Sequence, residues 1–190
     1  MQISLMRGLL ALMLAALPIT AHCTTLDERV AQCNACHGEG GNSVMESIPS
    51  LAGQPDFFLL NQLVLLREGV RKIDAMSDIV KPLTDSEIQN LASYYTKQPA
   101  KLTGNQPQRE KVETGAKLAT QKRCNSCHGN ELAGDQQVPR IAKQRVDYLI
   151  GSLKSYRDNT RTGADTSMSA MIFGLSDADL EALAHYAASR

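Results

Sequence analysis

The pentapeptide Cys-x-x-Cys-His occurs twice in this chain of 190 residues, at residues 33–37 and 124–128. Two cysteines at this spacing can form thioether bonds to the two vinyl groups of one haem, and the next histidine is then held under the iron as an axial ligand. We therefore expect two covalently bound haem c groups. The candidate attachment residues are Cys33, Cys36, Cys124 and Cys127, and the candidate proximal ligands are His37 and His128.

A six-coordinate haem iron needs a second axial ligand, usually Met or His. Apart from the motifs, only His22 and His185 are present, and neither has a counterpart near the other motif. Met76 and Met168 follow the motif histidines by 39 and 40 residues, and each stands seven residues before a Leu-Thr-Asp or Leu-Ser-Asp sequence. We expect these two methionines, in loop-like stretches, to bind the far side of each iron.

Other chemistries explain these residues less well. A zinc site of four cysteines normally has its two Cys-x-x-Cys pairs within about 20 residues of each other, but here 91 residues separate them. A thioredoxin-type pair needs no histidine and sits in a βαβ unit. Met45 and Met171 are alternative methionine ligands without counterparts, and methionine often only fills a core.

Much of the chain repeats at an interval of 90 to 92 residues. Residues 48–54 (IPSLAGQ) match residues 138–144 (VPRIAKQ), and residues 83–85 match residues 175–177. This interval indicates a tandem duplication. The repeat also pairs Pro49 with Pro139, and the carbonyl group of each proline could accept a hydrogen bond from the motif histidine of its repeat.

Arginines recur at the same interval. They could contact haem propionates, contact a partner or face solvent, and they are Arg67, Arg71, Arg157 and Arg161.

The apolar pattern within each repeat is helical, and no alternating run of β-branched residues indicates a sheet. A helix is expected in the middle of the first repeat, at 54–67, and capping boxes at Thr84 and Ser176 should open the last helix of each repeat. We therefore expect an all-α protein. Its predicted organisation is a signal peptide (1–23), a first domain (24–97), a linker (98–109) and a second domain (110–190).

Residues 1–23 combine a basic Arg7 with an apolar stretch from Leu9 to Leu17, which is typical of a secretory signal peptide and too short for a membrane span. An uncleaved anchor and a lipidated Cys23 are the alternatives. The two halves differ in charge: residues 24–97 carry six Lys/Arg and ten Asp/Glu, whereas residues 98–190 carry thirteen and ten. This asymmetry could orient the protein between partners or be only compositional drift.

Taken together, the two Cys-x-x-Cys-His motifs, the Pro-Ser-Leu-Ala-Gly-Gln sequence at 49–54 and the placement of Met76 and Met168 resemble class I cytochromes c. The tandem arrangement is similar to that of the dihaem cytochrome c4 family over residues 24–190. The resemblance implies two class I cytochrome c domains, each wrapped around a covalent haem with His and Met ligands. One departure is a short first helix, in which Asp27 and Glu28 stand where the second repeat has Leu118 and Ala119. The usual contact between first and last helices is therefore in doubt in the first domain.

The resemblance implies a periplasmic electron carrier rather than an enzyme, because two filled axial positions leave no site for a substrate. A quinol-oxidising complex, a terminal oxidase or a dehydrogenase would be its redox partner, with no nucleic-acid partner and at most peripheral membrane association. One alternative is a cytochrome subunit held permanently by a periplasmic dehydrogenase. Another is a dihaem peroxidase or thiosulfate-oxidising enzyme, which would need an open or unusual iron ligand.

Overall fold

The computed structural model describes residues 24–163 and 165–190, so the predicted signal peptide and Cys23 lie outside the described residues. Within these ranges the chain is helical; it has no strand, and Asp135 and Val138 form an isolated bridge. The predicted all-α fold is confirmed. The first domain contains α1 (Leu26–His37), η1 (Glu39–Gly41), α2 (Asp56–Arg67), α3 (Asp74–Val80) and α4 (Asp85–Thr96). The second domain contains α5 (Arg109–Gln121), α6 (Asn125–His128), α7 (Val146–Arg157), α8 (Thr166–Ile172) and α9 (Asp177–Ala188).

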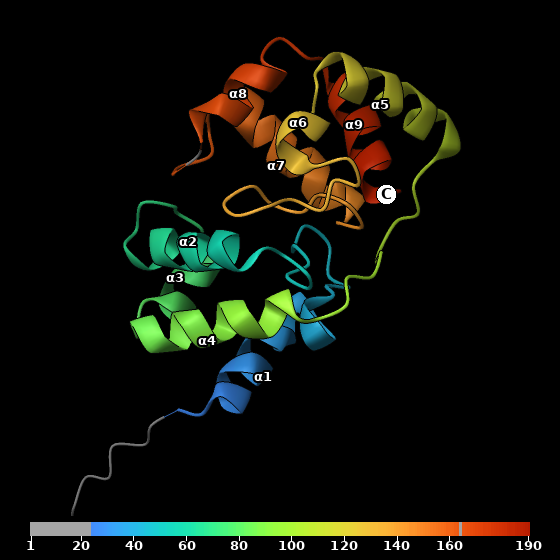
Figure 1. Cartoon of the computed structure of the whole chain (residues 1–190). Coiled ribbons are helices and arrows are strands. Elements are labelled where there is room, and N and C mark those ends of the chain that lie inside the picture. Colours follow the sequence, from blue (N-terminus) through green and yellow to red (C-terminus); the bar gives the residue numbers. More distant parts are fainter. Residues whose placement is uncertain (1–23, 164) are drawn as a thin grey trace, which may run out of the picture.

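The two domains lie one above the other, and the loops that follow the two motifs face each other across the interface (Figure 1). Residues 97–108 connect α4 to α5 along one side of the molecule (Figure 1). None of the described helices is both long enough and apolar enough to cross a membrane.

The last helix of each domain starts at a reciprocal cap, as the sequence predicts. The Thr84 hydroxyl accepts a hydrogen bond from the Glu87 amide, and the Glu87 carboxylate accepts one from the Thr84 amide. Ser176 and Asp179 form the same pair at the start of α9. Each cap satisfies two backbone donors that the first helical turn would otherwise leave unpaired.

The first and last helices pack differently in the two domains. In the second domain α5 crosses α9 closely at Gly115, where there is no room for a side chain beside Ala182 and Tyr186. In the first domain α1 and α4 meet over a smaller area, through an Arg29–Glu87 ion pair of 2.8 Å and a 2.9 Å hydrogen bond from Tyr95 to Asn34. The weaker helix contact expected in the first domain is therefore present.

The sequence of α4 fits this smaller contact. Ala182 and Tyr186 of α9 correspond to Asn90 and Tyr94 of α4 at the repeat interval of 92 residues. Asn90 is exposed, whereas Ala182 is buried under α5. A polar residue thus stands at the position that α5 covers in the other domain.

Arg67 and Arg157 form contacts within their own domains, which differ from the expected contacts with haem propionates, a partner or solvent. Arg67, at the end of α2, donates to the Leu83 carbonyl and pairs with Asp85 at 2.7 Å. Arg157, at the end of α7, donates to the Leu175 carbonyl and pairs with Asp177 at 2.6 Å. Each arginine therefore ties the middle helix of its domain to the start of the last helix, through its Nη1 group, while its Nε group pairs with the next residue, Glu68 or Asp158.

The stretches that hold Met76 and Met168 are helical, and the expectation of loops was wrong. Met76 lies in α3, and Met168 lies in α8, which opens with the Asp165 carboxylate accepting from the Ser167 amide. Both helices have seven residues, about two turns. A segment of this length contains too few apolar positions for a helical period to be recognised in the sequence.

Candidate functional site

Each motif histidine makes the same hydrogen bond to a proline carbonyl. His37 Nδ1 lies 2.8 Å from the Pro49 oxygen, and His128 Nδ1 lies 2.8 Å from the Pro139 oxygen. Because a carbonyl oxygen only accepts, Nδ1 carries the proton in both rings. Nε2 is then the unprotonated nitrogen, which is the form that binds a metal. The predicted role of the two prolines as histidine acceptors is confirmed.

Both histidines are buried at the C-terminal ends of helices. His37 ends α1 and His128 ends α6, and each is 7% exposed. Burial lowers the pKa of both imidazoles, and the hydrogen bond to the proline carbonyl opposes this effect. The neutral imidazole is therefore favoured, which suits a ligand.

The four motif cysteines are free thiols beside these histidines. In each motif the first cysteine, Cys33 or Cys124, is half-buried, and burial raises the pKa of its thiol. The second, Cys36 or Cys127, is exposed. Because the two motifs lie in different domains, the structure brings the four thiols together as two separate pairs.

The four candidate methionines differ in burial. Met76 is half-buried and packs against the same apolar cluster as Cys33, whose buried members include Val80, Ile88 and Leu91. Met168 is also half-buried. The alternatives Met45 and Met171 are 45% and 44% exposed, so neither fills the core.

The first domain suits a large flat apolar group such as a porphyrin. Helix α2 is apolar around most of its surface, yet only Leu59 and Leu66 are buried. Leu60, Leu63 and Val64 remain half-buried and pack against the same apolar cluster as Cys33 and Met76. A helix this apolar requires more cover than the neighbouring helices supply. Together with the paired thiols and the oriented histidine, these side chains fit a haem.

The interface between the domains is built around two glutamines, Gln54 and Gln144, for which the repeat pattern alone predicted no role. Gln144 accepts from the Ser50 amide at 2.8 Å and donates to the Ser50 carbonyl at 2.9 Å. Gln54 accepts from the Arg140 amide at 3.0 Å and donates to the Arg140 carbonyl at 2.9 Å. Their identical position in both repeats, after Pro-Ser-Leu-Ala-Gly and Pro-Arg-Ile-Ala-Lys, was the available signal.

Other polar contacts join the domains around this pair. The Lys72 amide donates to the Thr162 hydroxyl at 2.7 Å. The Arg140 side chain donates to the Ala52 carbonyl at 2.7 Å, and burial without an acidic partner lowers its pKa to about 10. Arg145 reaches the Ser43 carbonyl at 3.3 Å. The interface is therefore largely polar and hydrogen-bonded through backbone groups.

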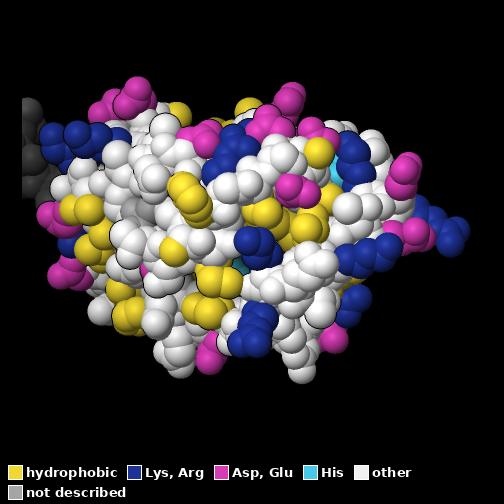
Figure 2. Space-filling model, turned by 90° about the horizontal axis from the view of Figure 1, so that it is seen from above, with side chains coloured by type: hydrophobic (Ala, Val, Ile, Leu, Met, Phe, Trp, Pro, Cys, Tyr) yellow, Lys and Arg dark blue, Asp and Glu magenta, His cyan; other side chains and the backbone are white. Residues whose placement is uncertain are grey.

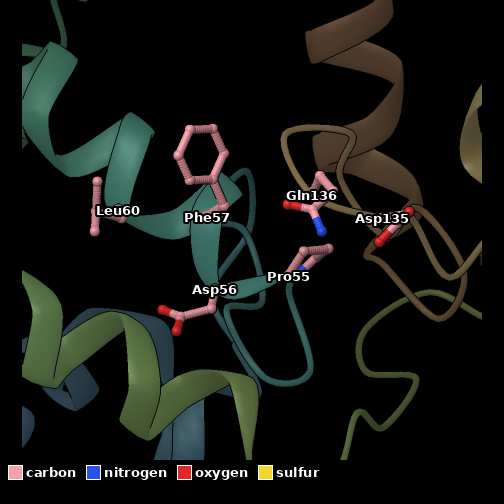
Figure 3. Close-up of a pocket in the computed structure, with 6 residues that line it drawn as sticks. All are labelled: Pro55, Asp56, Phe57, Leu60, Asp135 and Gln136. Atoms are coloured by element: carbon pink, nitrogen blue, oxygen red, sulfur yellow. The ribbon is translucent and has the colours of Figure 1, made fainter.

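Two hollows open at this interface. One, of about 390 Å³, lies between the start of α2 and the turn at Asp135 and Gln136, with the Phe57 ring and Leu60 on one side (Figure 3). The other, of about 290 Å³, is lined by Arg71 and Arg161 among others. Neither contains a residue of the two motifs. Seen from above the second domain, apolar side chains form small groups among charged ones (Figure 2).

Comparisons with known proteins agree with this architecture. The family model described as cytochrome c matches residues 112–189, and that described as cytochrome C oxidase, cbb3-type, subunit III matches residues 29–94. Cytochrome c4 of Stutzerimonas stutzeri is 35% identical over 179 residues, which cover 83% of this chain and 84% of the relative. The chain belongs to the cytochrome c4 family.

The structural comparison gives the same family. The crystal structure of reduced recombinant cytochrome c4 from Pseudomonas stutzeri superposes with a TM-score of 0.78 at 29% identity, covering 85% of this chain and 94% of that chain. A protein named thiosulfate dehydrogenase electron acceptor, from Thiomonas intermedia, is 30% identical and covers 84% of this chain and 79% of the relative. The prediction of two class I cytochrome c domains is confirmed, and cytochrome c4 proteins transfer electrons rather than act as enzymes.

Proposed function

We propose that this protein is a periplasmic carrier of single electrons with two covalently bound haem c groups. Cys33 and Cys36 would form the thioethers to one, and Cys124 and Cys127 those to the other. His37 with Met76, and His128 with Met168, would be the axial ligands. When bound, each haem supplies an iron that cycles between the ferrous and ferric states by one electron.

The protein's own residues prepare both sites for this exchange. The Pro49 and Pro139 carbonyls hold the imidazole rings so that Nε2 is unprotonated. The apolar cluster around Met76 would exclude water from the haem and hold its ligands in place during electron exchange. A methionine ligand raises the reduction potential relative to a second histidine, which suits a carrier that accepts electrons from a respiratory donor such as a quinol-oxidising complex.

The observation that carries this proposal is the identical histidine–proline bond in both domains, each beside a pair of free thiols. The test is to isolate the mature protein from a host that attaches haem c and titrate it electrochemically. We expect two haems per chain and two reversible one-electron steps. A chain with one haem, or one that turns over a small substrate without a redox partner, would contradict the proposal.

A second candidate rests on the relative from Thiomonas intermedia, which is named for accepting electrons from thiosulfate dehydrogenase. Under this alternative the chain is the cytochrome subunit of a periplasmic dehydrogenase. Affinity purification from the native periplasm distinguishes the two roles. A dehydrogenase subunit that stays bound in stoichiometric amount supports the second, and a chain recovered alone that is reduced by several donors supports the first.

A further inference from the structure

One peptide group in each domain connects the motif histidine to a glutamine of the other domain. The Pro49 carbonyl accepts from His37 Nδ1, and the amide of the same peptide unit, on Ser50, donates to Gln144 Oε1 at 2.8 Å. The Pro139 carbonyl accepts from His128 Nδ1, and the Arg140 amide donates to Gln54 Oε1 at 3.0 Å. The connections are crossed, so each histidine ends its hydrogen-bond chain in the opposite domain.

The orientation of both glutamine amides is determined by their partners. A backbone N–H must meet the oxygen, and a backbone carbonyl must meet the NH2 group. Each glutamine holds both groups of one residue, Ser50 or Arg140, and all four residues are at most 6% exposed. Water therefore does not compete for these bonds.

Hydrogen bonds in such a chain strengthen one another. When the amide of a peptide unit donates to a good acceptor, the carbonyl of that unit becomes more negative and accepts more strongly. A stronger acceptor at Nδ1–H gives the imidazole more anionic character and makes it a more basic ligand. A more basic axial ligand favours the ferric state, and hydrogen bonding around the ligand is one of the ways in which a protein sets a haem potential.

We infer that Gln144 and Gln54 are positioning residues that lower the reduction potential of the haem in the opposite domain. Gln144 acts on the site of His37, and Gln54 acts on the site of His128. The inference rests on the proposed binding of haem to the two motifs. Because each glutamine acts only while the domains are docked, the potential of each site depends on the presence of the other domain.

The two connections are not identical. Gln144 Oε1 also accepts from the Arg145 amide at 3.0 Å, so two donors share it. The residue that corresponds to Arg145 in the first repeat is Pro55, which has no amide hydrogen, and Gln54 Oε1 is left to the Arg140 amide. The effect of removing each glutamine is therefore expected to differ in size while having the same sign.

The test uses the full two-haem protein and measures the potential of each haem separately, by following its assigned NMR methyl signals during a redox titration. In Gln144→Leu, the ratio of reduced to oxidised haem at a fixed applied potential should rise about threefold at the His37 site. This ratio corresponds to a reduction potential about 28 mV higher, since a tenfold change in a one-electron equilibrium is about 59 mV. The His128 site should stay at its wild-type value. In Gln54→Leu, the ratio should rise at the His128 site and stay at its wild-type value at the His37 site.

A conservative variant keeps the test valid if the leucine variants do not fold. Gln144→Glu retains the acceptor, which becomes anionic as the pH rises, so the potential of the His37 site should fall with pH more steeply than in the wild type. The matched control is Thr162→Val, which removes the interdomain bond to the Lys72 amide without touching either proline peptide.

Equal shifts at both haems, or the same shifts in Thr162→Val, would overturn the inference by showing that the glutamines only hold the domains together. Unchanged potentials in both leucine variants would also overturn it. Failure of the proposed function is distinguishable, because it would appear in the wild-type protein as the lack of two one-electron steps.

Discussion

Gly115 of α5 lies directly against the carbonyl oxygen of Ala182 in α9. A methyl group at position 115 would overlap this oxygen and the Tyr186 side chain. The glycine is therefore what allows the first and last helices of the second domain to cross so closely. The Ala182 carbonyl group and the Tyr186 Cβ are held by the backbone of α9 and cannot move aside as the end of a flexible side chain could. The two helices would therefore have to separate to accept a larger residue.

We expect Gly115→Ala to destabilise the second domain by roughly 1–3 kcal/mol, the usual cost of overpacking a tight contact. The matched control is Gly151→Ala in α7, where nothing lies within 4 Å of the added carbon. That change should leave stability unchanged or raise it by about 0.5–1 kcal/mol, since alanine is the better helix residue. Urea unfolding of the two-haem proteins, compared with wild type, measures both effects. Equal stability of the two variants would show that the helices do not rely on this close approach.

The contrast between Thr84 and Gly115 shows what the sequence could and could not predict. A capping box lies within four consecutive residues, so Thr84 and Glu87 were recognisable in the sequence and are confirmed. The role of Gly115 depends on the distance between two helices that are 67 residues apart in the chain. Local pattern does not contain that distance.

Some features of the candidate haem sites could also be predicted from the sequence, and others could not. The histidine–proline bonds were predictable because a proline follows the motif histidine at nearly the same distance in both halves of the chain, by 12 and 11 residues. The crossed bonds of Gln54 and Gln144 depend on how two domains dock, which neither repeat encodes alone. The helical setting of Met76 was missed because α3 has only seven residues. Its axial role, and that of Met168, stays a prediction.

We expect His185 to make the stability of the second domain depend on pH, with no equivalent residue in the first domain. Its Nδ1 accepts from the Gln108 amide at 3.0 Å, just before α5 begins, and the residue is 4% exposed. Burial lowers the pKa of His185, Lys111 lowers it further, and Glu181 opposes them. The corresponding residue of the first domain is Ser93, which does not titrate.

The direction in which the free energy of unfolding changes with pH follows from the lowered pKa of His185. Above about pH 6.5, the ordinary histidine value, His185 is neutral in both states. As the pH falls below 6.5, the unfolded chain takes up the proton first, so the free energy of unfolding decreases until the pH reaches the lower pKa of the folded state. We expect His185→Asn, which keeps an acceptor near Gln108, to be less sensitive than wild type between pH 7 and pH 5. Parallel stability curves for the two proteins would contradict this.

Met76 and Met168 are expected to be the far axial ligands of their haems. Replacing either with alanine should lower the potential of the haem in the same domain by about 59 mV or more, a tenfold change in its redox equilibrium, because methionine ligation raises the potential. The far-red absorption of the sulfur–iron bond should fall by about half in each variant, because one of two such bonds is lost.

Met45→Ala and Met171→Ala are the controls for this experiment, because both residues are exposed and have no counterpart in the other repeat. They should leave both potentials and the absorption band at their wild-type values. If a control variant loses the band while Met76→Ala or Met168→Ala keeps it, the assignment of the ligands is wrong.

The difference in charge between the halves predicts which haem a charged reagent reaches faster. Residues 24–97 carry four more acidic than basic side chains, and residues 98–190 carry three more basic than acidic ones. An anionic oxidant should therefore oxidise the second domain faster, and a cationic oxidant of similar potential should favour the first. The preference should be clear at about 0.01 M salt, where the Debye length is about 30 Å, and should vanish near 1 M, where the Debye length is about 3 Å.

Stopped-flow measurements that resolve the oxidation of the two haems check this prediction. Oxidation rates that do not depend on salt would show that the charge asymmetry has no role in orienting the protein.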